Sequence, residues 1–241
     1  DRPLVEPEAG ILRLSSYLST TELELWQPLI ALFERPEEKG EVEAEQQSSW
    51  KTIFDLRFDQ LEHLTYQLKD IAAVATLSEE TVNIDLRSDL VDGQLQIPLN
   101  DSAQIPKINL SRLSLPKALL EEKVSGSTID PRQFLALDIA IGQLIIGEHN
   151  WGSLAFELRP EVSGAAFNRI EGNLFGLKPG ALENQPATEF FWQFDGSRYS
   201  SRLVGPVAVD NIGDFLASGL DIPRIVDSQS GQMIFDLAWD D

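Results

Sequence analysis

Apolar and polar residues alternate with a period of two along most of this 241-residue chain. The clearest case is the segment Leu135–Pro160, whose alternate apolar residues are Leu137, Ile139, Ile141, Leu154, Phe156 and Leu158. Alternation of this kind buries one face of a β-strand and leaves the other face in water. The segment therefore predicts two β-strands, each with one apolar face.

The same pattern occurs earlier in the chain. When Asp55–Leu61 (DLRFDQL) is aligned with Asp138–Leu144 (DIAIGQL), the Asp, two alternate apolar positions, Gln and Leu coincide. Recurrence of a pattern is typical of a sheet that is extended by repetition, rather than of a closed globule built around a catalytic pocket.

Similar alternation predicts strands over most of the sequence. We expect them at about residues 11–18, 52–61, 64–74, 81–88, 93–98, 107–115, 134–146, 151–159, 165–178, 187–195, 198–207 and 232–239. Asp92-Gly93 and Asp195-Gly196 predict tight turns between neighbouring strands, because Asp-Gly favours the two-residue turns of β-hairpins.

Two short helices are predicted between the strands. The first covers about residues 24–34, where a Ser-x-x-Glu capping pattern precedes a wide apolar stripe. The second covers about residues 211–218, with Asp210 as its N-cap and Gly219 just beyond its end.

The order of these elements is not the strand–helix alternation of a parallel doubly wound sheet. The sequence instead favours a mainly β fold with an antiparallel, meandering sheet and short helices at its ends. Because the chain begins with Asp1, we expect it to be a piece of a longer protein. Residues 1–35 would then end a preceding repeat, residues 36–50 would form an acidic loop, and residues 51–241 would form a repeat region with an internal linker at 117–131.

Composition opposes several classes of function. The net charge of −20 opposes binding to nucleic acid or to an anionic membrane surface, because both require a positive field. With no cysteine, the chain has no disulfide, no thiolate metal site and no thiol nucleophile, which suits the cytoplasm and a bacterial periplasm equally. No apolar run approaches the roughly 20 residues of a membrane-spanning helix.

No catalytic motif accompanies the strands. The chain has neither a phosphate-binding glycine loop nor a nucleophile elbow. Its two histidines, His63 and His149, fall at predicted turns without a cluster of possible partners. Asp236, Asp240 and Asp241 fit a solvated strand face better than a cation site. We therefore expect no enzyme activity, no cofactor and no metal.

Seven aromatic residues allow two interpretations. They either fill the core of a closed sandwich or line an open apolar groove on a single curved sheet. From the residues alone, the closed core is the more ordinary arrangement. The seven residues are Trp151, Phe156, Phe190, Trp192, Phe194, Phe235 and Trp239.

The order of four segments resembles the carboxy-terminal half of YhdP-type proteins of the AsmA-like superfamily. The family pattern is an apolar strand pair, a Trp-containing strand, a helix that begins Asp-x-Leu-Gly, and a strand that ends Leu-x-Trp. The matching segments here are Leu135–Pro160, Phe191–Asp195, Asn211–Leu216 and Gly231–Trp239. The chain departs from the pattern at Ile212, where the family has Leu, and in the strongly acidic residues 36–49.

The resemblance implies an extended, curved antiparallel sheet forming an apolar groove. Such proteins are anchored in the inner membrane of Gram-negative bacteria, extend through the periplasm, and are thought to carry phospholipid toward the outer membrane. This chain would be a periplasmic segment, with an acyl lipid and the remainder of the parent chain as its partners. The expected lipid-groove residues are Leu137, Ile139, Ile141, Leu154, Phe156, Leu158, Phe235 and Leu237.

Two other functions stay open on the residues. A structural or interaction module of the cell envelope would have a closed, dry β-core and would bind no lipid. A glycan hydrolase would need a catalytic pair of carboxylates, and 39 acidic residues make accidental pairs too common for one to be identified.

Overall fold

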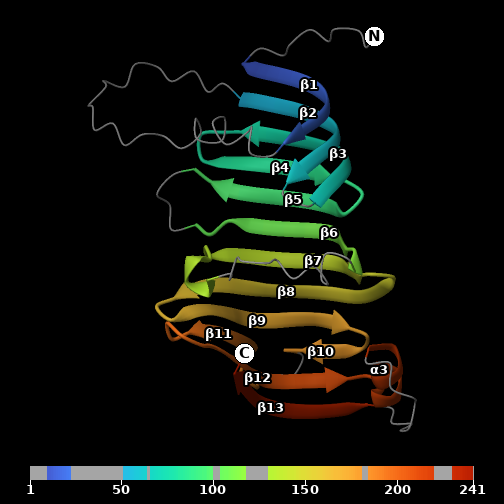
Figure 1. Ribbon diagram of the computed structural model, residues 1–241, viewed down its shortest axis with the longest axis vertical. Helices are drawn as coiled ribbons and strands as arrows, with labels where there is room; N and C mark the ends of the chain where they lie inside the picture. Colours follow the sequence, from blue (N-terminus) through green and yellow to red (C-terminus); the bar gives the residue numbers. More distant parts are fainter. Residues whose placement is uncertain are drawn as a thin grey trace. The chain divides into compact units, whose positions relative to one another are not determined.

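The computed structural model describes residues 10–22, 51–63, 66–99, 104–117, 130–180, 184–219 and 230–240 (Figure 1). Strands make up 73% of these residues and helices 6%, which confirms the predicted mainly β fold. The chain divides into two compact units, residues 1–103 and 104–241.

Unit 1 contains five strands in its described part, and their order in the sheet is their order in the sequence. β1 and β2 are parallel, and each later pair is antiparallel. The strands are β1 (Ile11–Glu22), β2 (Lys51–His63), β3 (Tyr66–Leu77), β4 (Thr81–Arg87) and β5 (Val91–Pro98).

Unit 2 contains eight strands and two short helices in its described part. β6, β7, β8 and β9 are successive neighbours, β10 and β11 both lie between β9 and β12, and β13 pairs with β12. The elements are β6 (Lys107–Leu115), the 3₁₀-helix η2 (Pro131–Gln133), β7 (Leu137–Ile146), β8 (His149–Glu161), β9 (Gly164–Leu174), β10 (Leu177–Pro179), β11 (Thr188–Phe194), β12 (Tyr199–Val209), α3 (Ile212–Gly219) and β13 (Gly231–Asp240).

The sequence repeat corresponds to a topological repeat. In unit 1, a long connection separates β1 from β2, which pairs with β1 in parallel and then forms an antiparallel hairpin with β3. In unit 2, β6, β7 and β8 have the same arrangement. Asp55 and Asp138, which the sequence alignment matches, lie in the second strand of their set. Sequence repetition thus marks equivalent strands of the two units.

The two parallel pairs, β1–β2 and β6–β7, make the strand pairing mixed rather than wholly antiparallel. Two neighbouring parallel strands need a connection of about a dozen residues or more, because the chain must return to the end of the sheet at which the first strand began. Residues 23–50 and 116–136 are long enough for this. The composition of these two connections predicts a helix, a loop and a linker. It does not predict that the strands joined by each connection are parallel.

The second predicted helix is confirmed, with a different N-cap and with Gly219 as its last residue rather than just beyond its end. α3 covers Ile212–Gly219, and the Asp214 N–H donates to Asn211 Oδ1 at 3.1 Å, so Asn211 caps the helix. The predicted cap, Asp210, instead accepts a hydrogen bond from Lys178 Nζ at 2.9 Å. The predicted helix at 24–34, the acidic loop at 36–50 and most of the linker at 117–131 lie outside the described residues.

One of the two predicted Asp-Gly turns is confirmed. Asp195-Gly196 joins β11 to β12, and Asp195 Oδ1 accepts hydrogen bonds from the backbone N–H groups two and three residues later, which lower the pKa of Asp195. The prediction for Asp92-Gly93 is wrong, since both residues lie in β5. The turn there is made by Ser88, whose hydroxyl accepts the Val91 N–H at 3.0 Å. A serine that satisfies the turn backbone has outweighed the Asp-Gly preference.

In unit 1, apolar side chains collect on one face of the sheet. Residues that pair across neighbouring strands point to the same side, so the strand register identifies the face. It carries Leu14, Leu18, Phe54, Leu56, Phe58, Ile71, Ile84, Leu86 and Leu95. The same reasoning applied to unit 2 builds its candidate site.

Candidate functional site

Most of the large apolar side chains of unit 2 lie on one side of its sheet. Paired residues of neighbouring strands point to the same side, and successive residues of one strand point to opposite sides. We call the side that carries Ile139 and Phe156 the apolar face, and the side that carries Asp138 and Glu157 the polar face.

The six residues predicted within Leu135–Pro160 lie together on the apolar face. They form three cross-strand pairs between β7 and β8, namely Leu137–Leu158, Ile139–Phe156 and Ile141–Leu154. Ile141 and Leu158 are buried, and the other four are half-buried. The face extends onto β6, because Ile108 and Leu110 pair with Ile139 and Ile141.

Phe235 and Leu237, from the other end of unit 2 in the sequence, lie on the same face. The register connects β8 to β13 through four successive pairs: Leu158–Phe167, Phe167–Phe190, Phe190–Leu203 and Leu203–Leu237. Phe235 is two residues from Leu237 in β13 and therefore points to the same side. The structure thus brings all eight predicted residues onto one face.

An aromatic row crosses the apolar face from β8 to β13. It consists of Phe156, Phe167, Phe190 and Trp239, with successive ring centroids 5.4, 5.3 and 6.1 Å apart. Phe190 and Trp239 are among the seven aromatic residues that the sequence left open between a closed core and a groove, and Phe167 was not predicted for either. The alternation of Phe190 and Trp192 in β11 is a sequence signal that places these two on one face, but it does not show which strands lie beside β11.

Two short helices lie against the apolar face near the ends of the strands. Beside η2, Phe134 contacts Trp192 with ring centroids 5.9 Å apart, and the Arg132 guanidinium lies 4.9 Å from the centre of the Phe194 ring. At the other end of β12, Ile212 of α3 lies close to Gly231. Both ends of the face are therefore partly covered.

The β13 part of the apolar face is open. Met233, Leu237 and Trp239 are 50%, 54% and 43% exposed, although all three are large and apolar. Within the described residues of unit 2, no second sheet packs over them. This region therefore differs from the core of a two-layer sandwich.

The polar face carries charged side chains in pairs. Arg159 Nη2 donates to Asp138 at 2.7 Å and to Glu157 at 3.0 Å. Farther along the sheet, Arg202 makes a bidentate pair with Asp236 at 2.8 and 2.7 Å. This pairing lowers the pKa of Asp236 and raises that of Arg202. Asp236 thus lies on a solvated strand face.

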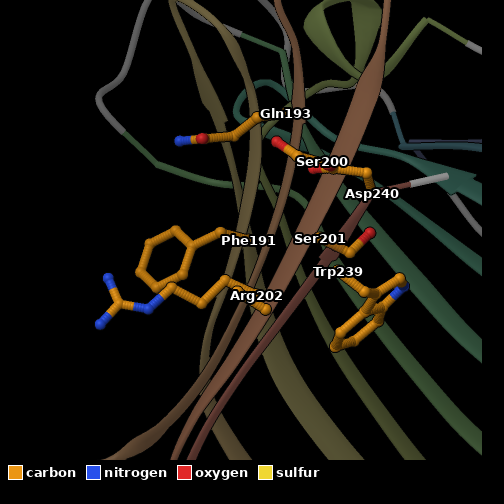
Figure 2. A pocket seen from close by; sticks show the side chains of 8 residues that line it. Phe191, Gln193, Ser200, Ser201, Arg202, Trp239 and Asp240 are labelled. Atoms are coloured by element: carbon orange, nitrogen blue, oxygen red, sulfur yellow. The ribbon is translucent and has the colours of Figure 1, made fainter.

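Two shallow hollows are lined mainly by residues of the polar face. One, of about 210 Å³, is bordered by Lys107, Asp138 and Arg169 among others. The second, of about 280 Å³, lies over β11, β12 and β13. Figure 2 shows that Phe191, Gln193 and Arg202 point to one side of these strands there, and Ser201 and Trp239 to the other. Neither lining includes a histidine.

Within the described part of the chain, the possible metal ligands are the acidic side chains and the two histidines. No group of three or more His, Asp or Glu side chains in it is close enough to hold a metal ion. His149 is exposed at the start of β8, and His63 is the last residue of β2. No helix among the described residues has the length and hydropathy needed to span a membrane.

The sequence matches the model of a known family. The match is to the family described as YhdP protein, and it covers residues 3–241 and hence both units. It confirms the resemblance inferred from the strand and helix motifs. Searches of curated proteins and of solved structures found no match.

Proposed function

This chain belongs to the YhdP family, and from that premise we propose that the unit-2 apolar face binds the acyl chains of phospholipid. Membership of the family suggests a lipid-transport module of the AsmA-like class. One observation carries the proposal: the eight predicted groove residues share a face on which none of the described strand residues of β7 to β13 is charged.

The proposed location and partners follow from the family. We propose that the parent protein is anchored in the inner membrane and extends through the periplasm, with this chain as one of its segments. The segment would conduct phospholipid between the inner and outer membranes. Its partners would be the phospholipid and the remainder of the parent chain.

Transfer of an acyl chain from water to the apolar face lowers the free energy. Each methylene that is buried contributes about 0.8 kcal/mol, and an exposed apolar patch of this kind usually marks a binding surface. The head group stays in water at the open side, so it needs no buried charge. The ion pairs of Arg159 with Asp138 and of Arg202 with Asp236 hold charges on the other side of the sheet.

The alternative is a scaffold module of the cell envelope whose apolar face is covered and dry. The burial of Ile141, Leu158 and Ala165 supports this alternative, since that part of the face is already closed. The exposure of Met233 and Leu237 in β13 supports lipid binding. The two functions differ in a measurable way, because a scaffold captures no acyl chain.

Ile139→Asp tests the proposal, with Ala140→Asp as its matched control. Ile139 and Ala140 are both half-buried, but the register places Ile139 on the apolar face and Ala140 on the polar face. We expect Ile139→Asp to abolish photo-cross-linking of phospholipid to the purified chain, and Ala140→Asp to leave it unchanged. Both variants are expected to unfold cooperatively on heating, because each new carboxylate can reach water.

Two results would contradict the proposal. One is the absence of any phospholipid cross-linked to the unaltered chain, at every phospholipid concentration tested. The other is equal capture by both variants. Unfolding of Ile139→Asp, together with no capture by the unaltered chain, would favour the scaffold, because a dry core would bury the unpaired carboxylate.

A further inference from the structure

We infer that one acyl chain lies along the aromatic row, across the strands, and that Trp239 contacts it at the open end of the row. This inference rests on the proposed function and adds to it the line of contact and its accessible end. The residues concerned are Phe156 in β8, Phe167 in β9, Phe190 in β11 and Trp239 in β13.

The aromatic row gives a continuous line of contact across the sheet. Two of its centroid separations, 5.4 and 5.3 Å, join rings of neighbouring strands and are close to the strand spacing of about 4.8 Å. The third, 6.1 Å, joins Phe190 in β11 to Trp239 in β13, on either side of β12. A hydrocarbon chain that crosses the strands can therefore touch all four rings. A chain laid along β11 instead would meet Phe190 and then leave the row.

The chemistry of the row selects a hydrocarbon as its occupant. The polar residues beside it on the apolar face, Thr188 and Ser201, are only 1% and 5% exposed, and the Thr188 hydroxyl donates to the Pro206 carbonyl at 2.7 Å. The row therefore offers an occupant almost no hydrogen-bonding group. A polypeptide segment laid on it would leave backbone N–H and C=O groups without partners, which is unfavourable for each group. An acyl chain carries no such groups.

Exposure makes the β13 end of the row its accessible end. Trp239 is 43% exposed, whereas the three phenylalanines are half-buried and Leu158, beside Phe167, is 7% exposed. In this chain, an occupant of the row is therefore most accessible at Trp239.

Site-specific photo-cross-linking tests the inference in the 241-residue chain. A photoreactive phenylalanine analogue is placed at one position at a time, and the protein is mixed with vesicles of palmitoyl-oleoyl phosphatidylethanolamine and phosphatidylglycerol. Phe190 and Phe191 form a matched pair, because both are half-buried in β11 and they point to opposite faces (Figure 2 shows Phe191 pointing away from Trp239). Trp239 and Ala238 form a second pair in β13.

We expect phospholipid capture at Phe190 and Trp239 to exceed that at Phe191 and Ala238 by roughly tenfold. A tenfold preference for the apolar face corresponds to the burial of about two more acyl methylenes there than on the polar face. Phe156 supplies a second position in the row if the Phe190 variant does not fold. Capture at Ile139 without capture at Phe190, Phe156 or Trp239 would overturn the inference and leave the proposed function intact.

Two further outcomes complete the test. Equal capture at Phe190 and Phe191 would overturn the inference, because it would show that phospholipid contacts both faces of β11 and does not prefer the aromatic row. Absence of capture at every tested position of the apolar face, Ile139 included, would contradict the proposed function as well. The failure of the row and the failure of lipid binding therefore give different patterns.

Discussion

Replacing Gly152 by alanine is expected to lower the free energy of unfolding by about 3 kcal/mol or more, from backbone strain and steric overlap together. Gly152 lies in β8 with a φ of +103°, which residues with a side chain rarely adopt. A Cβ at this position would lie 1.9 Å from the carbonyl oxygen of Asn173 in β9. That oxygen belongs to the backbone, so it can move only if the two strands separate.

Gly147→Ala is the matched control for this prediction. Gly147, in the turn between β7 and β8, also has a positive φ of +62°, but its Cβ would meet Lys117 Cβ at an ordinary 3.7 Å. We expect a loss of about 1 kcal/mol, due to conformation alone. Chemical denaturation of both variants gives the comparison. Similar losses would show that β8 and β9 separate readily and that their close approach does not constrain the sheet.

Strand positions in this chain follow from a local property, the alternation of apolar and polar residues. The strand predicted at 107–115 coincides with β6, and the one predicted at 187–195 matches β11 to within one residue at each end. The strand predicted at 165–178 is in fact β9 and β10, because Phe175 and Gly176 both have positive φ and interrupt it. Strand direction is not local, and the parallel pairing of β7 with β6 could not be predicted from either strand.

The candidate site shows the same limit. Alternation assigns Ile139 and Phe156 to one face of their own strands, and the short connection between β7 and β8 makes them neighbours. Nothing local relates them to Phe190 or Trp239, since that relation depends on the register of every strand between β8 and β13. Alternation in the last strand indicated Phe235 and Leu237, and the family resemblance placed them in one groove with the residues of β7 and β8. The exposure of the residues on the apolar face could not be predicted from the sequence either, because it depends on where η2 and α3 lie.

The difference in exposure within one face leads to a prediction about stability. Leu158 and Leu237 both lie on the apolar face, but Leu158 is 7% exposed and Leu237 is 54% exposed. Leu158 belongs to β8, one of the strands against which η2 packs. A carboxylate there would be buried without a partner, so we expect Leu158→Asp to lower the free energy of unfolding by roughly 3–5 kcal/mol. Leu237→Asp places its carboxylate in water and is expected to lose less than about 1 kcal/mol.

Lipid capture should follow a different order from stability. Leu237→Asp keeps the fold but introduces a charge beside Trp239, at the open end of the aromatic row, so we expect it to reduce phospholipid cross-linking while unfolding stays cooperative. Chemical denaturation and cross-linking of the two variants, each measured against the unaltered chain, separate the two effects. Equal destabilisation by both substitutions would mean that β13 is covered in solution and that the apolar face is closed along its whole width. If the Leu237→Asp variant is stable and captures as much lipid as the unaltered chain does, the lipid binds elsewhere, because a charge within the binding surface would reduce binding of the acyl chain.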